Sequence, residues 1–179
     1  MLACDFPHSE EVHLGRDDLI ISKTDLKGRI TYANRTFMSI AGFSEEELLS
    51  QPHNLIRHPD MPKGVFKFLW QELKAGKEFF GFVKNLTRDG QYYWVFANIT
   101  PDKDVYGNTQ GYFSVRRCPG KLAIKHIEPV YQTMREIEAR YTGANAARHS
   151  LDYLDQLLNN REMTYEELVI SLQAGKTDE

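Results

Sequence analysis

The stretch FFGFVKNLTRDGQYYWVFANIT, residues 79–100, decides the fold of this chain. Two runs rich in aromatic and β-branched residues, 79–87 and 91–100, flank the pair Asp89-Gly90. Such side chains favour strands, and Asp-Gly between two such runs is a strong signal for a tight hairpin turn. The stretch therefore predicts two long antiparallel strands.

Three shorter runs extend this hairpin into a sheet. Upstream, Leu19–Thr24 and Arg29–Asn34 are predicted strands joined by a turn at 25–28, and downstream the strand Gln110–Arg117 follows a turn at 106–108. Consecutive hairpins imply an antiparallel sheet with the helices gathered on one face. The predicted fold class is α+β, with five antiparallel strands and short helices.

Short helices are predicted between the second and third strands. One over Arg35–Ala41 ends at a glycine, and a second over roughly 45–50 begins with the capping-box pair Ser44 and Glu47. A third carries an apolar stripe within 60–76 and ends at Gly76.

The C-terminal part is predicted to be helical. Pro129 is expected to kink the first helix after Lys121, and Thr164 with Glu167 caps the last. These helices carry more apolar surface than one sheet can cover, so they either fold back on the domain or pair with a second copy. A homodimer through N- or C-terminal helices is one expectation. The predicted divisions are a lead-in or cap at 1–17, a domain at 18–118 and a helical extension at 119–179.

Composition limits the partners. The net charge is −3 with both signs mixed along the chain, which argues against a nucleic-acid-binding surface. No apolar run approaches the roughly 20 residues that cross a bilayer, and the N-terminus lacks the blocks of a signal peptide. Cys4 and Cys118 have no metal-ligand spacing. These features predict a soluble, cytoplasmic protein without a metal site.

The stretch PHNLIRHPDMP, residues 52–62, is the candidate binding segment. Its prolines restrict the backbone, Asp60 is a predicted N-cap and Pro62 a predicted first-turn residue of the next helix. Because a helix start favours anions, Arg57 and His58 beside it could grip a phosphate or carboxylate. A solvated surface turn accounts for the same residues equally well.

Several of these segments resemble a PAS domain. The runs 24–34 and 42–48 resemble its front half, and the runs 89–95 and 111–116 resemble its back half. The resemblance covers about residues 18–118, and its order agrees with the five predicted strands. Among PAS domains, the sensor domain of bacterial aerotaxis receptors is the most similar, on two segments: 52–62 and 81–85.

Resemblance to that group implies FAD, bound non-covalently between the sheet and the helices, with its redox state as the signal. Arg57, His58 and Asp60 match the family's FAD-binding segment, and Asn85 matches a strand residue near the flavin ring. Trp70 is added because its helix face is expected to point toward the sheet, although core packing is the simpler explanation. The full set of candidate cofactor-binding residues is Arg57, His58, Asp60, Asn85, Trp70, His53 and Asn34.

The resemblance predicts a redox or oxygen sensor that signals to a downstream protein. We expect this chain to correspond to the sensor module of chemotaxis receptors, without their membrane anchor and coiled coil. Two alternatives stay open. One is a haem-binding gas sensor with His53 or His58 as axial ligand, and the other is a cofactor-free PAS module for dimerisation or ligand binding. A cysteine-adduct photoreceptor is disfavoured, since neither cysteine lies on the helices that would face the ring. No phosphate loop or kinase or cyclase signature predicts an enzyme.

Overall fold

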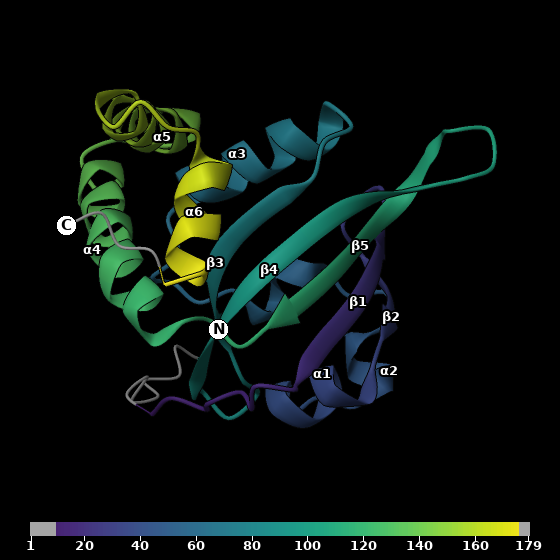
Figure 1. The fold of residues 1–179 in the computed structure, drawn as a ribbon. Coiled ribbons are helices and arrows are strands. Elements are labelled where there is room, and N and C mark those ends of the chain that lie inside the picture. The colour runs from purple at the N-terminus through teal and green to yellow at the C-terminus, as the bar shows by residue number, and fades with distance from the viewer. Residues whose placement is uncertain (1–9, 176–179) are drawn as a thin grey trace.

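The structure is a computed structural model that describes residues 10–175. A five-stranded antiparallel sheet in the order β2-β1-β5-β4-β3 forms its centre (Figure 1). The predicted α+β fold class is confirmed. The strands are β1 (Leu19–Asp25), β2 (Ile30–Ala33), β3 (Phe79–Leu86), β4 (Tyr92–Lys103) and β5 (Thr109–Arg117).

The hairpin predicted around Asp89-Gly90 joins β3 to β4. Gly90 has a φ of 84°, a conformation that glycine adopts without steric cost. The register pairs Val83 with Val95 and Asn85 with Tyr93. Side chains alternate between the two faces of a strand, so Val83 and Asn85 share one face of the sheet and Lys84 lies on the other.

Three helices and one 3-10 turn follow β2 and cover the inner face of the sheet, the face that carries Asn85. The first two of these helices both begin with a side-chain cap, of which only the second was predicted. Asn34 accepts a hydrogen bond from the Phe37 backbone N–H, and Ser44 forms the predicted capping box with Glu47. The elements are α1 (Arg35–Ala41), α2 (Glu45–Leu48), η1 (His53–Ile56) and α3 (Lys63–Lys74).

The predicted start of α3 is wrong. Asp60 is not the N-cap, because α3 begins at Lys63 and Pro62 occupies the cap position without a side-chain hydrogen bond. The carboxylate that caps this helix comes from Glu138, which accepts hydrogen bonds from the backbone N–H groups of Lys63 at 3.0 Å and Gly64 at 2.9 Å. The local sequence predicted the nearest acidic residue, Asp60, as the cap, whereas the fold brings in Glu138 from far along the chain.

The C-terminal helices are α4 (Lys121–Glu138), α5 (Ala144–Asn160) and α6 (Tyr165–Gln173). They fold back on the domain, which is one of the two predicted arrangements, and gather beside β3 and α3 (Figure 1). The helix α4 runs through Pro129 as a single element. The predicted cap of α6 by Thr164 and Glu167 is present.

These helices wrap the edge strand β3. On the outer face, Tyr131 of α4 stacks with Trp94 at a centroid distance of 6.3 Å. The Tyr131 hydroxyl also donates a hydrogen bond to the Phe82 carbonyl at 2.9 Å. The backbone of Lys84 is covered by the loop that contains His58. The backbone N–H of His58 donates a hydrogen bond to the Lys84 carbonyl at 3.3 Å. An exposed strand edge invites pairing with another chain, and these contacts close it.

The described part of the predicted lead-in lies against the domain. The Val12 N–H donates a hydrogen bond to the Tyr92 carbonyl at 2.8 Å, and the Tyr92 N–H donates to the Glu10 carbonyl at 3.1 Å. Leu14 is buried in the core. Residues 10–14 therefore form a short cap beside β4, while residues 1–9 lie outside the described part of the chain.

Close approach of α3 to α5 depends on Gly64. A Cβ atom at this position would clash with Oγ of Ser150 and lie 3.0 Å from the backbone nitrogen of Leu151. Overpacking costs about 1–3 kcal/mol, and alanine gains roughly 1 kcal/mol over glycine in a helix, so we expect Gly64→Ala to destabilise the protein by about 1 kcal/mol net. Urea unfolding followed by circular dichroism measures the change.

The matched control is Gln71→Ala, an exposed position on the same helix, where we expect a change within about 0.5 kcal/mol. If Gly64→Ala is as stable as the parent protein or more so, the helices tolerate a wider separation than the structure has.

Candidate functional site

A cavity of about 400 Å³ lies between the inner face of the sheet and the helix α3. Its volume falls within the roughly 300–1,000 Å³ of typical small-molecule sites. Residues from four strands, from η1 and from α3 contribute to its wall. This is the position between sheet and helices at which the sequence predicts a cofactor.

The apolar part of the wall is rich in aromatic side chains. Trp70 and Phe66 enter it from α3, and Tyr112 enters it from β5. The rings of Trp70 and Tyr112 meet edge to face at a centroid distance of 5.4 Å. Trp70 therefore contacts a neighbouring ring and also lines the cavity, and its predicted place beside a flavin stays a prediction.

Arg57 and Asn85 form a polar corner of the cavity. They are brought together by an isolated antiparallel bridge between their backbones. The Arg57 guanidinium carbon lies 3.5 Å from the centroid of the Phe66 ring, a cation–π geometry. Its Nε is buried and has no hydrogen-bond partner among the described residues. Burial lowers the pKa of Arg57.

A second polar group lies deeper, around Arg116. This residue is 2% exposed and lines the cavity, and its Nη2 donates a hydrogen bond to Oγ of Ser22. The same Ser22 oxygen is 3.2 Å from Nε2 of His53. Burial, with the nearby charge of Arg116, lowers the pKa of His53 to about 3. His53 is therefore neutral near pH 7, and its Nε2 can accept the Ser22 hydroxyl proton.

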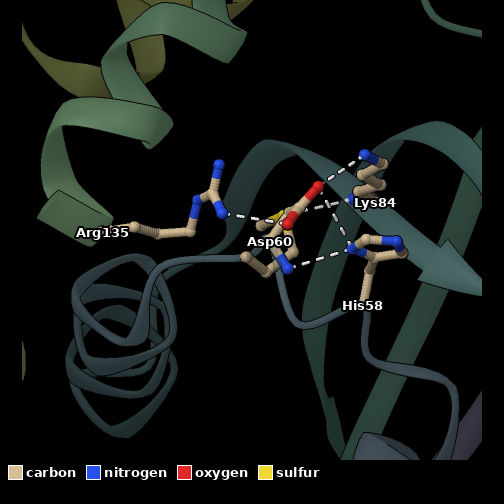
Figure 2. Close-up of polar contacts among 5 residues, drawn as sticks. His58, Asp60, Lys84 and Arg135 are labelled. Carbon is tan, nitrogen blue, oxygen red and sulfur yellow. Dashed lines mark hydrogen bonds and ion pairs between the residues drawn. The ribbon is translucent and has the colours of Figure 1, made fainter. Parts of the chain in front are cut away.

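Asp60 belongs to a different cluster, on the outer side of β3. Its carboxylate binds Nζ of Lys84 at 2.8 Å and Nη1 of Arg135 at 2.9 Å, and its backbone N–H donates to Nδ1 of His58 at 3.0 Å (Figure 2). Burial alone would raise the pKa of Asp60, but Lys84, His58 and Arg135 hold it below its usual value. One carboxylate thus joins β3 to α4.

The structure divides the predicted site residues into two groups. Arg57, Asn85, Trp70 and His53 all line the cavity. His58, Asp60 and Asn34 are not among the residues that line it. A role of any of these residues in holding a cofactor stays a prediction.

The residues outside the cavity wall have defined contacts. The buried His58 ring meets the edge of Tyr92 at a centroid distance of 5.9 Å. Asn34 is occupied at the start of α1, where its side chain accepts from the backbone of Ile21 and Phe37 and donates to the Leu19 carbonyl. Its three hydrogen bonds account for an asparagine at this position without a ligand.

Sequence reasoning missed Arg116. The signal was available, because Tyr112, Ser114 and Arg116 alternate along the predicted last strand and therefore share a face. An arginine in register with an inward-facing tyrosine is unusual, since charged residues are rarely buried without a partner.

Other kinds of site have little support in the part of the chain that the structure describes. Within residues 10–175, no group of three or more His, Cys, Asp or Glu side chains is placed to hold a metal ion. Cys118 is a free thiol and does not line the cavity, and Cys4 lies outside the described residues. None of the described helices is long and apolar enough to cross a membrane.

Comparison with known proteins agrees with this fold. A family model described as the PAS fold matches residues 30–116, the segment that contains four of the five strands and most of the cavity wall. The chain contains a PAS domain.

Two relatives of this PAS protein are named as a receptor and as a regulatory protein. It is 42% identical over 121 residues to the aerotaxis receptor of Escherichia coli strain K12, covering 68% of this chain and 24% of the receptor. It is 29% identical over 140 residues to the nitrogen fixation regulatory protein of Klebsiella pneumoniae, covering 78% of this chain and 25% of that protein. The chain thus spans about a quarter of the length of these relatives.

A solved structure supports the fold alone. A light-oxygen-voltage domain studied with a flavin analogue has a TM-score of 0.55 and 20% identity, covering 64% of this chain and 86% of that one. The predicted resemblance to PAS domains is confirmed by these comparisons.

The Asp60 cluster is predicted to stabilise the fold. Asp60→Asn leaves Lys84 buried without a carboxylate, and we expect a loss of about 2 kcal/mol, the scale of hydrogen bonds to charged groups. The free energy of unfolding in urea measures this loss.

Asp102→Asn is the matched control, because Asp102 pairs with Lys23 at 2.9 Å where both side chains are more than 40% exposed. Exposed pairs contribute about 0–1 kcal/mol. Equal losses in the two variants would contradict a special role for Asp60.

Proposed function

We propose that the PAS domain of this protein binds FAD non-covalently in the cavity and reports redox state or oxygen to a downstream signalling protein. The observation that carries the proposal is an aromatic cavity lined by two arginines, the half-buried Arg57 and the buried Arg116. Nε of Arg57 and the Nε and Nη1 of Arg116 are buried and lack hydrogen-bond partners among the described residues. Similarity to part of an aerotaxis receptor supports a sensor role.

The residues present fit a flavin. A flavin ring is flat and offers carbonyl and ring-nitrogen acceptors, which match the aromatic wall and the unpaired N–H groups of Arg57 and Arg116. Asn85, 4% exposed, adds an amide that can donate and accept. The cavity is of ring size, so the phosphates would lie toward its exposed rim, where Lys27 is the cation.

A bound flavin would supply electron chemistry, which protein side chains lack. The chain would contribute three things. Trp70 and its aromatic neighbours exclude water, Asn85 fixes the orientation of the ring, and Arg57 offers charge. None of these roles requires a catalytic nucleophile, acid or base, and we propose a sensor rather than an enzyme.

The geometry favours flavin over haem. His53 lines the cavity, but its Nε2 lies 3.2 Å from Oγ of Ser22 and would have to give up this partner to bind iron. His58 is not part of the cavity wall. Colour separates the cases, since flavin gives a yellow protein and haem a red-brown one. A folded protein that stays colourless after incubation with FAD would favour the cofactor-free module.

We expect freshly purified protein to show a flavin spectrum and to release FAD, rather than FMN, on denaturation; chromatography of the released chromophore identifies it. We expect Asn85→Ala to weaken FAD binding about 5- to 150-fold, because losing a hydrogen bond in a buried site costs about 1–3 kcal/mol. Titration of apoprotein with FAD measures the affinity.

Asn98→Ala is the control, because Asn98 lies on β4 and is hydrogen-bonded to Glu78 away from the cavity. It should bind FAD like the parent protein. Unchanged affinity and spectrum in Asn85→Ala would contradict the proposed role of the amide.

We propose that the signal leaves through α4. Asn85 faces the cavity, and the adjacent Lys84 faces outward and binds Asp60, which in turn holds Arg135 of α4 (Figure 2). A shift of β3 at Asn85 therefore acts on the contact that fixes α4. The partner, a cytoplasmic signalling protein or a second copy of the chain, would contact the C-terminal helices.

Hydrogen exchange tests this route. We expect reduction of bound flavin by dithionite to change the exchange of α4 amides in the parent protein, and Asp60→Asn to reduce the difference. Asp102→Asn should behave like the parent. Flavin reduction without any change in α4 exchange would contradict the route.

A further inference from the structure

Arg116 is an unusual buried charge. It is 2% exposed, and the described residues give it no ion pair and leave its Nε and Nη1 without hydrogen-bond partners. Its contacts are Oγ of Ser22 and the face of the Phe37 ring, 4.8 Å from the guanidinium carbon. A buried charge without a counter-charge is costly, so this arrangement calls for a function.

Lys84 shows that the same fold can pair a buried cation. It is 6% exposed, and Asp60 binds its ammonium at 2.8 Å. Lys84 faces away from the cavity, whereas Arg116 faces into it. The fold therefore supplies a carboxylate to the buried cation outside the cavity and none to the cation inside it.

The other ionisable groups around Arg116 add no negative charge. His53 is neutral because burial and Arg116 lower its pKa to about 3, and burial raises the pKa of Tyr93 to about 12. Arg57 contributes a second positive charge. Burial lowers the pKa of Arg116 itself to about 10, so it remains charged at neutral pH. Among the residues that the structure describes, the wall of the cavity holds positive groups and no carboxylate.

We propose that Arg116 is the subsite for the negative charge of reduced flavin, and that it makes the protein bind reduced flavin more tightly than oxidised flavin. A flavin ring gains negative charge when it takes up more electrons than protons. The inference rests on the proposed flavin site and adds to it a residue that sets the redox state the site prefers. Ser22 is the positioning residue, because its oxygen holds Nη2 of Arg116.

The expected size of the preference for reduced flavin follows from the burial of Arg116. An opposite charge within about 4–6 Å in a protein shifts a protonation equilibrium by about 1–3 pKa units, or tenfold or more. A tenfold preference for the reduced form raises the midpoint potential of bound flavin by about 30 mV relative to free flavin.

The test is a redox titration with dithionite and a reference dye, on holoprotein and on free FAD in the same buffer. We expect the parent protein to bind reduced FAD at least about tenfold more tightly than oxidised FAD. Arg116→Met should weaken the binding of reduced FAD at least about tenfold more than that of oxidised FAD and so lose the preference, while Arg116→Lys keeps part of it. Arg117→Met is the matched control, because Arg117 is the exposed next residue on β5 and its loss removes the same charge.

Protons give a second readout. With the negative charge held by Arg116, the parent protein should take up one proton per two electrons, so that its reduced-to-oxidised ratio at fixed potential falls about tenfold per pH unit. In Arg116→Met the uptake should approach two protons per two electrons, so that the reduced-to-oxidised ratio falls about a hundredfold per pH unit. This slope distinguishes a charge subsite from a residue that only supports the fold.

Four results would overturn the proposal. The first two are a midpoint potential of the parent protein at or below that of free FAD, and a midpoint potential of Arg116→Met equal to the parent's. The third is a drop in midpoint potential in Arg117→Met as large as in Arg116→Met. The fourth is that Arg116→Met weakens the binding of oxidised and reduced FAD equally. If Arg116→Met does not fold, the parent midpoint and Arg116→Lys decide the question. Failure of the flavin site itself would be distinguishable, since the parent protein would then bind no FAD.

Discussion

The alternation of side chains along β3 is the constraint on which the rest of the structure depends. Because neighbouring residues of a strand point to opposite faces, Asn85 enters the cavity and Lys84 enters the polar cluster on the other side. Asp60 completes that cluster and binds Arg135 of α4. A cavity and a helical extension far apart in the sequence therefore share one edge strand, and neither can be described without the other.

Positive charge is distributed around this strand in a second pattern. Outside, Asp60 compensates Lys84 and Arg135. Inside, Arg57 and Arg116 have no ion pair with a described residue. Burial of unpaired charge opposes folding, so under the proposed function the empty domain would be less stable and the cavity would gain affinity for an electron-rich ligand. This balance is consistent with a sensor whose state depends on what it binds.

Much of the fold could be predicted because its signals are local. Asp89-Gly90 specifies its hairpin. Ser44 and Thr164 each mark the start of a different helix, through contacts with the glutamate three residues further on. The start of α3 could not be predicted, because its cap is Glu138 of another helix. Arg116 was missed for a related reason: strand alternation gives its face, but only the assembled sheet reveals the missing counter-charge.

Glu138 has a consequence for how the cavity opens. Besides capping α3, its carboxylate accepts a hydrogen bond from Oγ of Ser150 on α5 at 2.6 Å, so three helices meet at one side chain. The helix α3 is also a wall of the cavity. A ligand that enters by displacing α3 must first break the Glu138 contacts and loosen the C-terminal helices. Exchange of a tightly held ligand would then be slow, with a lifetime set by how firmly those helices are attached.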